Sequence, residues 1–283
     1  MNSNEWPLIL FTLFSQAGAG ILVFGILLLN RSDGMQAATD PRRVLILTAM
    51  VLSGLALAIA FLHLGRPLQS VYALSNTGSS WLSREIILVA ALFGLLLLAS
   101  LLPFNTLWGT GTGKALTGLA AVTGLLLVYS MARLYMISTV PAWNTAWTPV
   151  GFFNSSLLLG SMASLLVIAW LLPRGGAPVE AAIRLLVWAA LAGSAIHLLH
   201  ALAGPGWQVE PGLPFPPAPI PVAWKLARIL CLLAGIVLLM LWHRMPAAAV
   251  PGWLLPALAL TGVAAAEVMA RYIFYATYFR VGM

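Results

Sequence analysis

Charged residues are scarce in this sequence. Its 283 residues include 14 basic and 7 acidic side chains, so charged residues make up 7% of the chain and apolar residues 61%. Soluble globular proteins carry about 25% charged residues. The composition therefore excludes a soluble globular protein and predicts an integral membrane protein, for which we expect a single membrane domain over residues 1–283.

Cysteine is nearly absent as well. With one cysteine, Cys231, no internal disulfide can form, and there is no CxxC pair to hold an iron–sulfur cluster or zinc. We expect Cys231 to be a small core residue and expect no metal site in this protein. The basic residues are dispersed rather than gathered in a run, which argues against a nucleic-acid partner.

Long apolar runs fill most of the sequence, and each is close to the roughly 20 residues that cross a bilayer as a helix. The runs cover residues 7–29, 44–64, 85–103, 115–139, 150–172, 180–203, 222–243 and 251–275. The first run has full spanning length and follows no basic segment, so we expect it to be retained rather than cleaved. The sequence predicts an all-α membrane protein, a polytopic bundle of eight transmembrane helices.

The connections between these runs differ in charge. With the amino terminus outside, the inner connections hold Arg31, Arg42, Arg43, Lys114, Arg174 and Arg244, and the outer segments hold Arg66, Arg84 and Arg280. Basic residues favour the cytoplasmic side of a membrane. We therefore predict that both termini lie on the outer, periplasmic side of a bacterial inner membrane.

In this topology the ionisable residues of the spans gather near the outer face. They are His63, Glu85, Arg133, His197, His200, Arg228, Glu267 and Arg271. Ionisable groups inside a membrane are costly and usually mark a site that handles a substrate or a proton. The alternative for a single residue is a side chain that reaches from a helix end toward water, which applies above all to Lys225, Arg228 and His200.

His63 is the sharpest catalytic candidate. An imidazole has an unperturbed pKa of about 6.5, so it accepts and releases a proton near neutrality. Gly65 and Pro67 break the helix directly after it. Glu85, which follows the returning loop, is placed to orient the imidazole or to relay its proton.

Two further pairs lie four residues apart in predicted helices. Glu267 and Arg271 share a helix face and can pair, and Tyr275 continues that face. Arg133 and Tyr129 have the same spacing. A structural ion pair that fixes helix packing remains the alternative.

Haem is a further possibility raised by the histidines. His63 with His197 or His200 could supply two axial ligands, but a wire of two haems across the bilayer needs a second pair near the inner face, where only His243 lies. We expect no haem.

Several short motifs occur in a characteristic order along the sequence. They are Glu5-Trp6-Pro7, Leu62-His63-Leu64-Gly65 with Pro67, Ser83 with Glu85-Ile86, Thr139-Val140-Pro141 with Trp143, Trp147-Thr148-Pro149 with Gly151-Phe152-Phe153, and Glu267, Arg271, Phe274-Tyr275 and Val281-Gly282-Met283. This ordered set resembles the DmsC family, the membrane-anchor subunits of dimethyl sulfoxide reductase-type molybdoenzymes.

The resemblance implies an eight-helix subunit that binds and oxidises menaquinol near the outer face. Its electrons would pass to an iron–sulfur subunit and then to a molybdenum bis-pterin catalytic subunit outside the membrane, which holds the terminal reductase activity. The resemblance ties His63 to quinol oxidation and links Glu85 to the same site. We expect the quinol site to comprise His63, Arg66, Ser83, Glu85, Arg133, Trp147, Glu267 and Arg271. His197 and His200 match no motif of the family.

Three alternatives stay open. The protein could anchor a polysulfide or tetrathionate reductase-type complex, it could be a proton-coupled transporter, or it could be a purely structural anchor. Trp147 likewise has two interpretations, since tryptophans at span ends often form an interfacial belt in contact with lipid.

Overall fold

The computed structural model describes residues 6–29, 40–63, 76–103, 110–204, 220–246 and 250–281, apart from the side chains of residues 26–29 and 62–63. The helices in these ranges are α1 (Trp6–Leu29), α2 (Pro41–His63), α3 (Trp81–Leu101), α5 (Gly111–Tyr135), α6 (Trp147–Leu171), α7 (Ala177–Ala203), α8 (Val222–Arg244) and α9 (Leu254–Ala276). All eight are long and apolar enough to cross a membrane. The predicted all-α fold with eight spans is confirmed, and the protein is a multi-pass membrane protein.

Three helix ends differ from the predicted boundaries by four residues, namely the start of α3 and both ends of α5, and the other ends differ by three residues or fewer. α3 begins at Trp81 instead of residue 85, because the Ser80 hydroxyl accepts a hydrogen bond from the Ser83 backbone N–H at 3.3 Å and caps the helix. Glu85 therefore lies one turn inside α3 and not at its start. α5 ends at Tyr135 instead of residue 139, and turns lead from there to α6.

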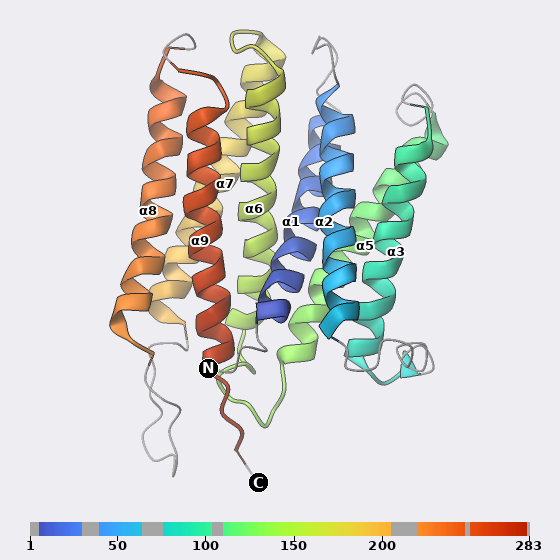
Figure 1. Ribbon diagram of the computed structural model, residues 1–283, viewed down its shortest axis with the longest axis vertical. Helices are drawn as coiled ribbons and strands as arrows, with labels where there is room; N and C mark the ends of the chain where they lie inside the picture. The colour runs from blue at the N-terminus through green and yellow to red at the C-terminus, as the bar shows by residue number, and fades with distance from the viewer. Residues whose placement is uncertain are drawn as a thin grey trace.

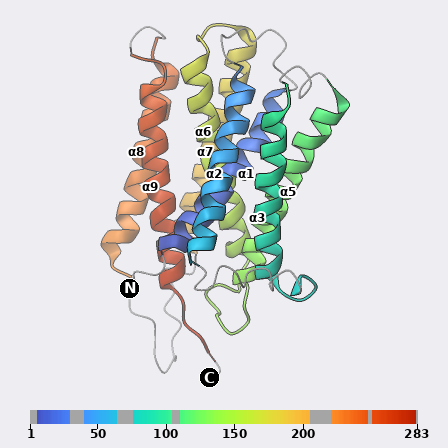
Figure 2. The same ribbon diagram turned by 45° about the vertical axis from the view of Figure 1, so that its right-hand side comes forward.

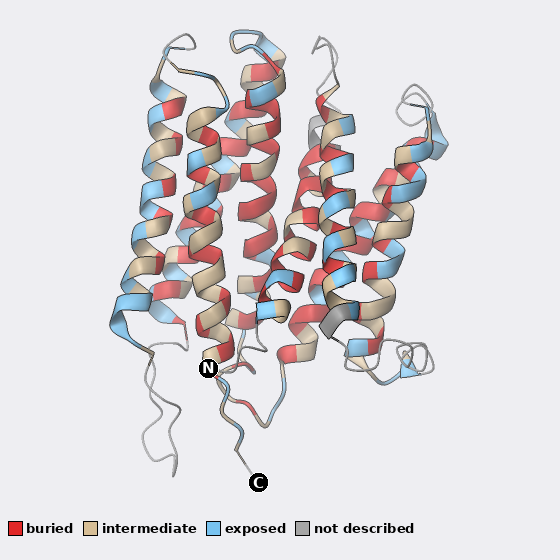
Figure 3. Ribbon diagram, in the orientation of Figure 1, coloured by how far each residue is buried: buried red, intermediate tan, exposed pale blue. Residues whose placement is uncertain are grey.

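The helices run up and down in one bundle (Figure 1). We call the end where α1 begins and α9 ends the lower end, as it is drawn in Figures 1 and 2. α1, α2, α3 and α5 pack together in one half, and α6 to α9 form the other half. α1 and α6 join the two halves, and they are the most buried helices, with 67% and 78% of their spanning windows buried against 28% for α2 and α8 (Figure 3).

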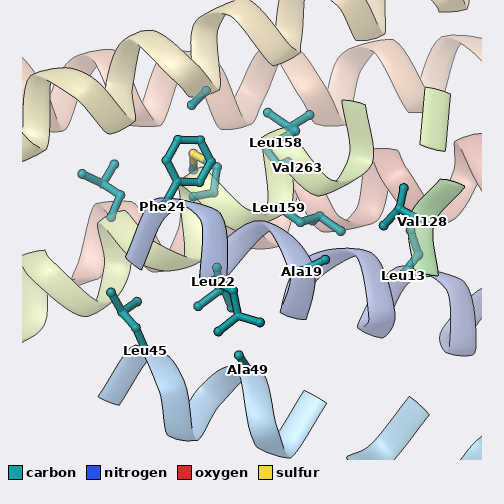
Figure 4. Packing of buried hydrophobic residues seen from close by; sticks show 14 of the residues in the cluster. Leu13, Ala19, Leu22, Phe24, Leu45, Ala49, Val128, Leu158, Leu159 and Val263 are labelled. Carbon is teal, nitrogen blue, oxygen red and sulfur yellow. The ribbon is translucent and has the colours of Figure 1, made fainter. Parts of the chain in front are cut away.

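Small residues allow α1 and α6 to pack closely. A Cβ atom added at Gly20 would overlap the backbone of Ser156, and one added at Gly160 would overlap the backbone of Gly20. Close approach of this kind strengthens van der Waals contacts between helices. These contacts drive helix association in a membrane, because lipid tails are as apolar as the helix surfaces and the hydrophobic effect contributes little. Figure 4 shows the buried side chains around α1, which include Leu13, Ala19, Leu22, Leu45, Ala49, Val128, Leu158 and Leu159.

At the lower end, the segment between α5 and α6 is hydrogen-bonded to the end of α9 and to the segment that follows it. The Val281 backbone N–H donates to the Thr139 carbonyl at 2.8 Å, and the Trp143 indole N–H donates to the Phe274 carbonyl at 2.8 Å. The segment between α5 and α6 and the segment after α9 are thereby fixed beside the residues described next.

Candidate functional site

The predicted polar residues fall into two groups at the lower end, one in each half of the bundle. Glu85 lines a cavity between α1, α2, α3 and α5, which we call the Glu85 cavity. Glu267, Arg271 and Trp147 lie among α6 to α9, together with His197 and further polar side chains. The structure therefore does not bring the predicted residues into one pocket.

The Glu85 cavity is almost entirely apolar and encloses about 100 Å³. Its apolar lining consists of Pro7, Leu8, Phe11, Leu57, Ile59, Ala60, Phe61, Leu82, Ile86, Val89 and Leu134. Glu85 and Tyr135 supply the polar side chains among the described lining residues. A few polar groups in an apolar cavity between helices are typical of a site for a small apolar ligand.

The Glu85 carboxyl is buried without a complete set of hydrogen bonds. Its side chain is 4% exposed, and Oε2 has no hydrogen-bond partner among the described residues. Burying a polar atom in this state costs about 1–3 kcal/mol, and more for a charged group. Such an atom suits a ligand that supplies the missing hydrogen bond.

The end of α2 lies beside this cavity. Phe61 lines the cavity, and α2 ends two residues later at His63. The imidazole of His63 lies outside the described residues, as does Arg66. The backbone thus brings the end of α2 that carries His63 close to the cavity of Glu85.

Tyr135 connects the Glu85 cavity to the other half of the bundle. Its hydroxyl shares a 2.9 Å hydrogen bond with the hydroxyl of Tyr275 on α9. The Tyr135 ring is held by aromatic neighbours, with centroids 5.3 Å from Trp143, 5.6 Å from Phe152 and 5.4 Å from Phe274. The hydroxyl is therefore fixed in position by a rigid aromatic group.

The second group, which we call the histidine cluster, is centred on Glu267. His197 Nδ1 lies 2.8 Å from Glu267 Oε1, and the Ser155 hydroxyl donates to Oε2 at 2.7 Å. Arg228 Nε donates to His197 Nε2 at 2.8 Å. Because a guanidinium can only donate, His197 Nε2 must accept, so the imidazole is neutral and its Nδ1–H donates to Glu267.

Two arginines complete the histidine cluster. The second Arg228 contact is to His200 Nδ1 at 3.1 Å. Arg271 donates to Gln16 Oε1 at 2.9 Å and to the Ser155 hydroxyl at 3.3 Å, and its guanidinium lies 3.8 Å from the centre of the Phe152 ring. Glu267 and Arg271 share a helix face as predicted, but the Ser155 hydroxyl bridges them and they form no direct ion pair.

The cavity within the histidine cluster encloses only about 30 Å³. Such a volume holds a water molecule and is too small for an aromatic ring. Trp147 lies at this cavity, with its ring 5.6 Å from the His200 ring. The histidine cluster is therefore a compact polar network, whereas the Glu85 cavity is roomy and apolar.

Arg133 and Ser83 line neither cavity. The Arg133 guanidinium lies 5.6 Å from the centre of the Trp81 ring and 4.0 Å from the Met136 sulfur. Tyr129 packs edge-on against Trp81 at 5.7 Å, so Arg133 and Tyr129 meet the same tryptophan. Ser83 is buried in the first turn of α3.

Three residues of these sites carried little signal in the sequence. Gln16 is a polar amide within an apolar span, and that contrast alone could have singled it out. Tyr135 and Ser155 lie in spans where tyrosine and serine are ordinary. Only the packing of α1, α5, α6 and α9 brings them together.

Comparison with known proteins places this protein among membrane anchors. Residues 1–277 match the family described as DMSO reductase anchor subunit (DmsC). The sequence is 33% identical over 176 residues to a subunit of the anaerobic dimethyl sulfoxide reductase of Escherichia coli (strain K12), and the match covers 59% of this protein and 58% of that subunit.

Two further relatives give a similar picture. A subunit of the anaerobic dimethyl sulfoxide reductase of Haemophilus influenzae is 29% identical over 157 residues, which are 55% of this protein and 56% of the relative. The anaerobic dimethyl sulfoxide reductase subunit YnfH of Escherichia coli is 29% identical over 169 residues, 58% of each protein. The matches thus span a little under three fifths of these relatives.

Proposed function

Because the protein belongs to the DMSO reductase anchor subunit family, we propose that it anchors a dimethyl sulfoxide reductase-type complex and oxidises menaquinol for it. In this proposal it lies in the bacterial inner membrane, with its lower end on the outer side. Electrons pass to an iron–sulfur subunit and on to a molybdenum bis-pterin subunit, which carries the terminal reductase activity. Family membership favours this function over a proton-coupled transporter.

The observation that carries the proposal is Glu85 Oε2, a buried carboxyl oxygen in an apolar cavity that has no hydrogen-bond partner among the described residues. A quinol combines an apolar ring and tail with two hydroxyl groups. A quinol hydroxyl in the cavity would donate to Glu85 Oε2, and the aliphatic and aromatic lining would hold the ring. The buried carboxyl and the ligand would thus satisfy each other.

The proposed reaction removes two electrons and two protons from the quinol. The electrons leave to the partner subunit, and the ring becomes the quinone. His63, at the end of α2, accepts the two hydroxyl protons of the quinol one after the other and releases each to the outer side, and Glu85 orients the imidazole or relays the protons. Since electrons and protons leave on the same side, oxidation would move little net charge across the membrane.

We assign the remaining predicted residues supporting roles in this proposal. Ser83 lies between the cavity-lining residues Leu82 and Glu85 on α3, and Arg66, which lies outside the described residues, follows His63 by three positions in the sequence. Arg133, Trp147, Glu267 and Arg271 would act through the packing and charge of the surrounding helices, since none of them lines the Glu85 cavity.

The test uses membranes that contain the whole complex with Glu85→Gln. A general base or proton relay contributes about 10²- to 10⁴-fold to a rate. We expect reduction of dimethyl sulfoxide by a naphthoquinol to fall by at least about 100-fold, while reduction by a soluble viologen dye stays unchanged. The matched control is Glu180→Gln, which alters an acid that pairs with Arg174 at the other end of the bundle.

Two results would contradict the proposal. An unchanged quinol-linked rate in Glu85→Gln would remove the cavity from the reaction. An equal fall of the quinol-linked and dye-linked rates would mean that Glu85 serves only to stabilise the complex.

A further inference from the structure

The Glu85 cavity is lined by a second residue with a polar side chain, Tyr135, which has no role in the proposed reaction. Tyr135 lines the cavity, and its hydroxyl meets the Tyr275 hydroxyl at 2.9 Å. Tyr275 also forms a side-chain hydrogen bond with Thr12 on α1. The Thr12 hydroxyl in turn reaches the carbonyl oxygens of Leu8 at 2.9 Å and Ile9 at 3.0 Å.

These contacts form a row of three hydroxyls that begins at Tyr135, a residue that lines the cavity, and ends at the backbone of α1. Each hydroxyl has one hydrogen and two lone pairs, and its hydrogen rotates to suit its neighbours. The row can therefore point in two directions. Either Tyr135 donates to Tyr275, Tyr275 to Thr12 and Thr12 to a backbone carbonyl, or Thr12 donates to Tyr275 and Tyr275 to Tyr135.

The two directions present different faces to the cavity. In the first, the hydrogen of Tyr135 is used by Tyr275, and its oxygen is left to accept a hydrogen bond. In the second, Tyr135 accepts from Tyr275, and its own hydrogen is left to donate into the cavity. The change requires rotation of three O–H groups and no movement of the rings.

A quinol and its quinone need opposite partners. The quinol hydroxyl donates and needs an acceptor, whereas the quinone carbonyl that replaces it can only accept and needs a donor. We propose that Tyr135 binds a ring oxygen of the quinol and of the quinone in the Glu85 cavity, and that Tyr275 and Thr12 reverse the hydrogen bond when the ring is oxidised. This inference rests on the proposed function. The tyrosines exchange no proton with the ligand in this step.

The surroundings favour such a fixed and reversible partner. Tyr275 is 5% exposed, Thr12 is fully buried, and the Tyr135 ring packs between Trp143, Phe152 and Phe274. A side chain that is already held in place loses little conformational entropy when a ligand binds. The row also anchors the cavity to α9, one turn beyond Arg271 of the histidine cluster.

The test compares Tyr135→Phe and Tyr275→Phe in membranes with the whole complex. The probes are the oxidised and reduced forms of a short-chain naphthoquinone, whose dissociation constants are measured separately. Tyr135→Phe removes one hydrogen bond from both forms. We expect both dissociation constants to rise about tenfold, which corresponds to about 1.4 kcal/mol.

Tyr275→Phe gives the more diagnostic result. It leaves Tyr135 free to donate to the quinone, but a quinol that donates to Tyr135 would leave the tyrosine hydrogen without an acceptor. We expect weaker binding of the quinol by about fivefold to tenfold, with the quinone within about twofold of the parent protein. A purely structural role of Tyr275 would weaken both forms equally, and that result would overturn the proposal.

Two controls separate this inference from the proposed function. Tyr272→Phe removes a hydroxyl three residues earlier on α9, from a ring that stacks on Trp224, and should leave both affinities unchanged. Unchanged affinities in Tyr135→Phe, together with a lowered quinol-linked rate in Glu85→Gln, would overturn the role of Tyr135 and leave the proposed function standing. No effect of either variant would defeat both. If Tyr135→Phe also lowers the dye-linked rate, the variant has disturbed the complex as a whole. The proposal is then decided by Tyr275→Phe alone, through the ratio of its effects on quinol and quinone binding.

Discussion

The two halves of the bundle bury their acids in opposite ways. In the histidine cluster both oxygens of Glu267 are hydrogen-bonded, and the cavity is water-sized. In the Glu85 cavity one carboxyl oxygen has no partner among the described residues, and the space is about three times larger. A buried charge with its partners fixes the packing of helices, whereas a buried acid without them and beside free space is suited to bind a ligand.

The largest effect on stability should come from Glu267. In Glu267→Ala the imidazole of His197 and the hydroxyl of Ser155 lose their acceptor, and the charges of Arg228 and Arg271 lose the nearby carboxylate inside the membrane. Removing one partner of a buried ion network costs about 3–5 kcal/mol. We expect the thermal midpoint of the complex in detergent to fall, and the quinol-linked and dye-linked rates to fall in proportion. A fall of the quinol-linked rate with an unchanged dye-linked rate would mean that the histidine cluster takes part in quinol oxidation, and would contradict its structural role.

Substitutions that fill the two cavities should have different effects, one on the quinol-linked rate and the other on the stability of the complex. Ala60→Phe places a ring in the Glu85 cavity and should lower the quinol-linked rate by about tenfold or more without changing the dye-linked rate, because the ring competes with the ligand. Ala270→Phe overfills the small cavity of the histidine cluster and should destabilise the complex by about 1–3 kcal/mol. Both rates and the thermal midpoint are measured. The same pattern for both variants would contradict the distinction.

A smaller effect is expected from Ser155, which bridges Glu267 and Arg271. Ser155→Ala removes a donor to one and an acceptor from the other, and should cost about 1–3 kcal/mol. Ser164 on the same helix is the matched control, because its buried hydroxyl has no partner among the described residues, so Ser164→Ala should be neutral or slightly stabilising. Equal losses of thermal stability in both variants would show that the bridge is unimportant.

The sequence was sufficient for the fold but not for the grouping of the polar residues. Apolar length alone predicts eight spans, because a helix must satisfy its backbone hydrogen bonds while crossing lipid. The start of α3 was displaced by four residues because a cap such as Ser80 is a local side-chain contact that hydropathy does not register.

The spacing of Glu267 and Arg271 predicts a shared helix face and does so correctly. It cannot say what lies across from that face, and the structure brings Ser155, His197 and Gln16 there from three other helices. Depth in the membrane likewise suggested one cluster of ionisable residues at one end. Which half of the bundle each residue enters depends on helix packing, so Glu85 and Glu267 appeared to be neighbours. The roles of His63 and Glu85 stay predictions.

The most direct test is to locate the bound ring. A naphthoquinone carrying a photoreactive azide is crosslinked to the complex in membranes, and the labelled peptides are identified by mass spectrometry. We predict labels on residues 57–61 of α2 and 82–89 of α3, suppressed by excess unlabelled naphthoquinone. Specific labelling of α6 or α7 around Trp147 and His200, with α2 and α3 unlabelled, would contradict the assignment of the quinol to the Glu85 cavity.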